Sequence, residues 1–243
     1  MRVPRMTGEI ERRLLVNYRV DPAALRPLLP ERFRPQLVEG AAVAGICLIR
    51  LGDLRPRWTP APLTGLGLTT ENAAHRIAVE WDGPAGVESG VYIPRRDTDS
   101  RLTVLLGGRA FPGVHSRARF TVAESDDRLR VAFRSDDGRA AVDVAVAVEP
   151  RLEGSSLFPD VAAASRFFEQ GTVGWSPAHR AGQVEGVRLD TTAWRVDPGR
   201  VLSASSSFFD DTDVFPAGSA QLDCALVMRK VPVDWSALPA AAA

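Results

Sequence analysis

The chain has 243 residues, of which 45% are hydrophobic and 25% charged, so it can bury a sizeable core in one large domain or two small ones. This composition excludes collagen, a coiled coil or disorder as the main architecture. Thirty basic residues balance thirty acidic ones, so no net field favours a nucleic acid or an anionic membrane as partner. Lys230 is the only lysine, which leaves one side-chain amine for Schiff-base chemistry.

The cysteines and the N-terminus predict a cytoplasmic protein. Cys47 and Cys224 lie far apart, without CxxC or zinc-ligand spacing, so we expect reduced, buried thiols. The opening MRVPRMTGEIERR lacks the apolar core of a signal peptide, and the longest apolar run is much shorter than the roughly 20 residues of a membrane span. We expect one domain over residues 1–236, followed by a flexible tail over 237–243, where the sequence is rich in alanine.

The first half of the chain alternates strands and short helices. Residues 12–20 predict a strand, after which Asp21 and Pro22 supply the N-cap and first position of a helix that runs to residue 28. Residues 41–51 predict a strand buried on both faces, or nearly so. Proline and glycine make 56–67 a loop. Further predicted elements are strands at 68–81 and 90–94 and a helix at 101–106.

The second half predicts more strands than helices. Three alternating runs over 116–148 indicate a meander of antiparallel hairpins. Residues 160–170 are typical of an amphipathic helix that ends at Gly171. Late strands are expected at 184–196, 201–208 and 220–231. Nine or ten strands with three short helices define an α+β, mostly β fold, whose strands should close on themselves or form a sandwich because open edges aggregate.

No cofactor or metal motif is present in the sequence. There is no GxGxxG fingerprint, P-loop or GxSxG elbow, so we expect no nucleotide cofactor. His75, His115 and His179 are far apart and form no HExxH, so the spacing predicts no metal site.

The strand TTENAAHRIAVEW carries the most suggestive polar residues. Alternation places Glu71 and His75 on one face, and Asn72 and Arg76 on the other. Glu71 and His75 are too far apart to touch, but both can line a cavity, where low polarity suits a carboxylate to proton transfer. The alternative is a Glu71 paired with one of the many arginines.

Several further residues are candidates for ligand binding. The planar guanidinium matches a carboxylate in a bidentate manner, which makes Arg19, the Arg95–Arg96 pair and Arg109 candidate clamps. Trp194 is either a core residue or part of a ligand wall.

Several motifs resemble one superfamily. LLVNYRVDPAALRPLLPERF, LTTEN, GGRAFP and TTAWRVDPGR resemble segments of the acetoacetate decarboxylase-like superfamily, and SLFPDVAAASRFFEQG is similar to its uncharacterised YqjF-like branch. The resemblance spans nearly the whole chain. It implies a cone-like antiparallel β-barrel with a few flanking short helices and a ligand cavity.

The resemblance also implies site residues, and it departs from the family at one of them. It implies that Glu71 is the active-site Glu and that Phe111 belongs to an aromatic–Pro pair. In the decarboxylases a lysine pair follows this proline and forms the Schiff base, whereas here Gly113 follows Pro112. Without that amine there is no iminium to accept electrons. His115 is the nearby group that can act as acid or base.

The sequence therefore predicts a protein that binds a small organic acid or carbonyl compound inside a barrel. If it is an enzyme, we expect lyase-type or isomerising proton transfer without a cofactor, with Glu71 and His115 as catalytic residues. The alternative is a non-catalytic binding or regulatory module. Since related barrels commonly assemble, the resemblance also implies a homo-oligomer. The expected substrate-binding residues are Arg19, His75, Arg109, Phe111 and Trp194.

Overall fold

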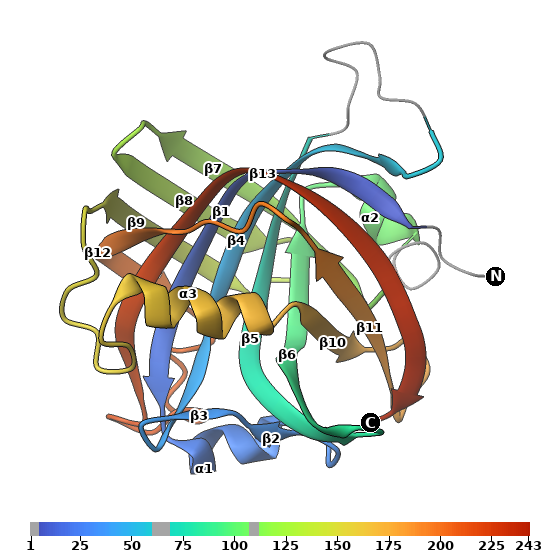
Figure 1. Cartoon of the computed structure of the whole chain (residues 1–243), viewed down its shortest axis with the longest axis horizontal. Coiled ribbons are helices and arrows are strands. Elements are labelled where there is room, and N and C mark those ends of the chain that lie inside the picture. Colours follow the sequence, from blue (N-terminus) through green and yellow to red (C-terminus); the bar gives the residue numbers. More distant parts are fainter. Residues whose placement is uncertain (1–4, 60–68, 107–111) are drawn as a thin grey trace.

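The computed structural model describes residues 5–59, 69–106 and 112–243 of the chain, which form a large curved β-sheet with three short α-helices (Figure 1). The strands are β1 (Met6–Val20), β2 (Arg34–Pro35), β3 (Leu37–Val38), β4 (Ala41–Pro56), β5 (Thr70–Gly83), β6 (Gly86–Thr98), β7 (His115–Glu124), β8 (Arg128–Ser135), β9 (Ala141–Val148), β10 (Val173–Pro177), β11 (Gln183–Asp190), β12 (Asp197–Ser206) and β13 (Ala220–Ala242). The helices are α1 (Pro22–Leu25), α2 (Arg101–Leu106) and α3 (Val161–Gln170), and a 3₁₀ turn, Arg26–Leu28, follows α1.

The strand order closes part of the sheet into a ring. Hydrogen-bonded neighbours run in the order β11-β10-β6-β7-β8-β9-β12-β13-β1-β4-β5-β2, with β3 beside β4. Two additional pairings, β11 with β13 and β5 with β6, join strands that are distant in this order. Strands β13, β1, β4, β5, β6, β10 and β11 therefore follow one another round a closed circuit of backbone pairing.

The observed architecture confirms the predicted α+β, mostly β class with short helices. The sheet is mixed rather than wholly antiparallel, because β6 pairs in parallel with both β7 and β10. A parallel pair needs a crossover connection, and the segment between β6 and β7 contains α2. The hairpin meander is confirmed as β7, β8 and β9.

Local capping signals determine where two helices begin. Asp21 caps α1 by accepting a hydrogen bond from the Ala23 amide at 2.9 Å, and Asp160 caps α3 by accepting from the Ala163 amide at 2.7 Å. Gly171 ends α3 as predicted. Among the described residues, no helix is long and apolar enough to cross a membrane.

Both faces of the central strands are buried. One face of β1, β4 and β5 packs into the main hydrophobic core together with β8 and β9. The opposite face packs against α3, which lies across these strands in Figure 1. Leu14 and Ile46 belong to the first cluster, and Leu15 and Cys47 to the second. Burial on both faces explains the continuous apolar run of β4.

Two segments differ from the expectations. Residues 237–242, predicted as a flexible tail, are the end of β13, where Ala237 pairs with Val187 and Ala242 with Gln183 of β11. These backbone pairs bring order to a segment whose composition alone suggests none. Trp194 was expected in a strand, but it lies in the connection between β11 and β12.

Candidate functional site

A cavity of about 200 Å³ lies inside the closed circuit of strands. Each of the seven strands contributes to its wall, as do Phe168 of α3, His115 of β7 and Trp194 of the connection between β11 and β12. Most of the wall is apolar. The apolar side chains include Ile49, Leu51, Val91, Ile93, Val187, Leu189 and Trp235, and the polar ones include Arg13, Asn72, Arg76, Arg96, Asp97 and His115. A mostly apolar cavity with a few convergent polar groups is typical of a small-molecule site.

Arg76 is a buried cation on this wall. Its side chain is only 3% exposed, its guanidinium stacks over the Phe168 ring at 4.6 Å, and Nη2 donates to Oδ1 of Asn17. Its Nε has no hydrogen-bond partner, and no carboxylate of the described residues pairs with it. Burial lowers the pKa of Arg76 to about 10, so the group remains charged at neutral pH.

Arg96 repeats this arrangement on the neighbouring strand. Its Nε donates to Oγ of Ser176 at 2.8 Å, whereas its Nη2 is buried without a partner. Burial lowers the pKa of Arg96 to about 10. Residue 96 pairs with Ala74 of β5 and with His115 of β7, so the cation and the histidine lie on adjacent strands.

His115 lies on the cavity wall as a neutral imidazole. Burial, and then the charge of Arg96, lower its pKa to about 4. Its Nδ1 lies 3.1 Å from the carbonyl oxygen of Gly113, and only a protonated nitrogen can hydrogen-bond to a carbonyl. The proton is therefore assigned to Nδ1, which leaves Nε2 as the atom able to accept a proton.

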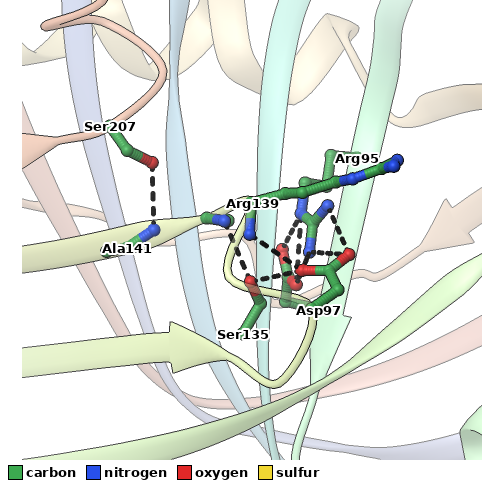
Figure 2. A network of polar contacts seen from close by, with 8 residues as sticks. Arg95, Asp97, Ser135, Arg139, Ala141 and Ser207 are labelled. Carbon is green, nitrogen blue, oxygen red and sulfur yellow. Dashed lines mark hydrogen bonds and ion pairs between the residues drawn. The ribbon is translucent and has the colours of Figure 1, made fainter.

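The cavity carboxylate Asp97 does not neutralise these arginines. Its oxygens accept from Nε and Nη2 of Arg95, at distances from 2.8 to 3.2 Å. Figure 2 shows the polar network in which Arg95 and Asp97 lie, close to Ser135 and Arg139. Asp137 accepts from the other side of Arg95, which therefore has two carboxylate partners and is no free clamp.

Glu71 does not line the cavity. Its carboxylate binds Arg12 and lies 2.6 Å from Nε of Arg50, and both arginines also bind Glu124 of β7. The four side chains form a closed ring of ion pairs that connects β1, β4 and β5 to β7. Of the two interpretations of Glu71, the ion-paired carboxylate is the one that the structure shows.

The remaining predicted residues are distributed over three places. His75 is 1% exposed and packs against Phe208 and Phe209, outside the cavity wall. Arg19 is exposed on β1, and Trp194 lies on the cavity wall with its Nε1 donating to Oγ of Ser165 at 3.0 Å. Arg109 and Phe111 lie outside the described residues.

The cavity residues Cys47, Arg13 and Arg76 were not predicted from the sequence as site residues. Strand alternation separated Arg76 from Glu71 correctly, but nothing in the pattern showed which face of β5 borders a cavity. Lys230 is exposed on β13 and does not line the cavity. Among the described residues, no group of three or more His, Cys, Asp or Glu is placed to hold a metal ion.

The chain shares its fold with solved structures of acetoacetate decarboxylase and similar proteins. Acetoacetate decarboxylase from Legionella pneumophila aligns with a TM-score of 0.63 and 12% identity, covering 97% of this chain and 87% of that one. An acetoacetate decarboxylase-like enzyme from Sphingomonas wittichii RW1 gives a TM-score of 0.61 and 13% identity, covering 100% of this chain and 94% of that one. The enduracididine biosynthesis enzyme MppR complexed with pyruvate gives 0.62 and 12%, covering 100% and 91%.

The family model for DUF2071, described as an uncharacterized conserved protein, matches residues 7–218, and the chain belongs to this family. This confirms the resemblance found in the sequence motifs. No curated protein matches the chain. At 12 to 13% identity, the solved structures show a shared fold and no more.

Proposed function

We propose that the protein binds a small organic acid in the cavity, with the carboxylate between Arg76 and Arg96 and the apolar part against the surrounding wall. One observation carries this proposal: buried Arg76 and half-buried Arg96 each have a buried guanidinium nitrogen without a hydrogen-bond partner, and neither has a carboxylate partner among the described residues. A buried charge without a counter-ion is costly, and a ligand carboxylate supplies that counter-ion. The pyruvate bound to MppR is a ligand of this kind in the same fold.

Calorimetric titration with pyruvate and with its neutral amide tests this proposal. We expect pyruvate to bind and the amide to bind much more weakly. Arg76→Gln and Arg96→Gln should each lower the affinity for pyruvate about tenfold or more, because a hydrogen bond to a charged group contributes roughly 1.5–3 kcal/mol. The matched control is Arg130→Gln, which removes an exposed arginine paired with Asp143 outside the cavity. Equal affinities in all three variants would falsify the assignment.

His115 gives the proposed site a route to proton transfer. A neutral Nε2 on the cavity wall can remove a proton from the carbon next to a ligand carbonyl, and the two arginines stabilise the negative charge that results. Isomerisation through an enolate begins with this step, as do eliminations that start by removal of such a proton, and the step requires no Schiff base. Exchange of the pyruvate methyl protons in D2O, followed by NMR, should occur with the wild type and be lost in His115→Gln. If both proteins bind pyruvate and neither exchanges protons, the non-catalytic binding module is the better description.

A further inference from the structure

Cys47 is a thiol on the cavity wall. It lies on β4 opposite Ala74 of β5, is 6% exposed, and forms no disulfide. Paired residues of neighbouring strands lie on the same face of a sheet, and so do residues two apart in one strand. Cys47 therefore lies on the same face as Arg76, which is two residues after Ala74.

The surroundings of Cys47 are positively charged. Nε of Arg13 donates a hydrogen bond to Sγ at 3.3 Å, and Arg76 and Arg96 lie on the same cavity wall as this thiol. None of the three arginines has a carboxylate partner among the described residues. The sulfur atom of Cys47 thus accepts a hydrogen bond from one guanidinium and borders the cavity that two others line.

A second observation indicates a ligand beside the thiol. Arg76 is 97% buried on the same wall, and its Nε lacks any partner. An anion that pairs with this guanidinium enters the cavity that Cys47 borders. The thiol of Cys47 and the guanidinium of Arg76 therefore border the same cavity of about 200 Å³.

The other cysteine has the opposite surroundings. Cys224 is 3% exposed and does not line the cavity. Burial, and then the charge of Asp223, raise its pKa to about 12. The chain thus contains one thiol beside three cations and one beside a carboxylate, which makes Cys224 a built-in control for reactivity.

We infer that Cys47 is the nucleophile of the cavity and adds through Sγ to the carbonyl carbon of a 2-oxo acid whose carboxylate is held by Arg76 and Arg96. This inference rests on the proposed carboxylate site and names its substrate class. In the step, a bond forms between Sγ and the carbonyl carbon, and the π pair of the C=O bond moves to oxygen. The thiol proton ends on that oxygen, so nothing is oxidised or reduced and no other reactant is consumed. The product is a tetrahedral thiohemiketal, in a protein whose lysine lies outside the cavity.

Alkylation of the native protein tests the nucleophile. Iodoacetate and iodoacetamide differ in charge, and peptide mass spectrometry reports the rate at each cysteine. Relative to free cysteine, the iodoacetate-to-iodoacetamide rate ratio at Cys47 should rise about tenfold or more, because among the described residues of the cavity wall three arginines and a single carboxylate, Asp97, leave a positive charge, which concentrates anions. Cys224 should react slowly with both reagents. Excess pyruvate should protect Cys47, and Arg76→Gln should reduce the preference for iodoacetate.

Pyruvate labelled with carbon-13 at its carbonyl tests the covalent step. Protein-bound pyruvate should show a tetrahedral carbon signal in the wild type and in Cys224→Ser, but not in Cys47→Ser, which should still bind pyruvate by calorimetry. If pyruvate binds but Cys47 shows no preference for iodoacetate and no tetrahedral carbon forms, the nucleophile is wrong and the carboxylate site stands. If the wild type does not bind pyruvate, both proposals fail.

Discussion

The carboxylate of Glu71 pairs with the guanidinium of Arg12, and their side chains are only 10% and 3% exposed. Arg50 and Glu124 close the pair into a ring in which each arginine binds both glutamates. Because every member has two partners of opposite charge, the ring satisfies buried charges that would otherwise be costly. The ion pairs make Glu71 part of the scaffold, whereas Asn72, Ala74 and Arg76, on the opposite face of β5, line the cavity.

Glu71→Gln should destabilise the protein without abolishing ligand binding. The substitution removes the charge that Arg12 faces, and breaking a buried ion pair costs about 3–5 kcal/mol. Glu80→Gln on the same strand is the control, since its partner Arg34 is half-exposed and such pairs contribute about 1 kcal/mol or less. Denaturant unfolding measures both effects. A Glu71→Gln protein of wild-type stability that no longer binds pyruvate would return Glu71 to the site.

Gly174→Val should close part of the cavity. A Cβ at this position would lie 3.1 Å from Cδ1 of Ile93 and 3.6 Å from Nη2 of Arg96, so the valine methyl groups would occupy the space proposed for the carboxylate. We expect a tenfold or larger loss of pyruvate affinity, with a stability cost of about 1–3 kcal/mol for the added volume. Calorimetry and denaturant unfolding give the two values. Unchanged affinity would place the ligand elsewhere in the cavity.

Local signals in the sequence were sufficient for most elements of the fold. Asp21 and Asp160 mark the helix starts where the structure has them, and the alternating runs between residues 116 and 148 become β7, β8 and β9. These features depend on neighbours in sequence. The motif resemblance added the likeness to acetoacetate decarboxylase, which the solved structures confirm at the level of the fold.

The cavity could not be predicted in the same way. Alternation divides β5 into two sets, one with Glu71 and one with Arg76, but both faces of this strand are buried. A strand face that lines a cavity and a strand face that packs into the core therefore show the same alternation of residues in the sequence. The choice between them depends on α3 and on the pairing of β11 with β13, contacts between residues that are distant in the sequence.

Removal of residues 237–243 should open the ring of strands. The end of β13 pairs with β11, Ala237 lines the cavity, and Leu238 packs against the core. Leu238 is only partly buried, so loss of its side chain alone is expected to cost about 1–2 kcal/mol, and Leu238→Ala serves as the partial control. We expect the truncated chain to be less stable than Leu238→Ala and to lose pyruvate affinity. A truncated chain equal to the wild type in thermal unfolding and pyruvate titration would contradict this role of the segment.

His75 should make the fold sensitive to acid. Burial, and then the charge of Arg95, lower its pKa from 6.5 to about 4, and its Nδ1 has no hydrogen-bond partner. Between pH 6.5 and 4 the folded state therefore binds fewer protons than the unfolded state. The contribution of neutral His75 to the free energy of unfolding is present above pH 6.5 and is lost as the pH falls toward 4.

His75→Phe tests this linkage, because an aromatic ring can pack against Phe208 and Phe209 without titrating. The loss of unfolding free energy between pH 6.5 and 4 should shrink by up to about 3 kcal/mol in this variant. Part of the acid sensitivity should remain, because the pKa of His115 is lowered in the same direction. Denaturant unfolding over this pH range measures the free energy of unfolding of both proteins. If that free energy falls equally with pH in the wild type and in His75→Phe, His75 is not the cause of the acid sensitivity.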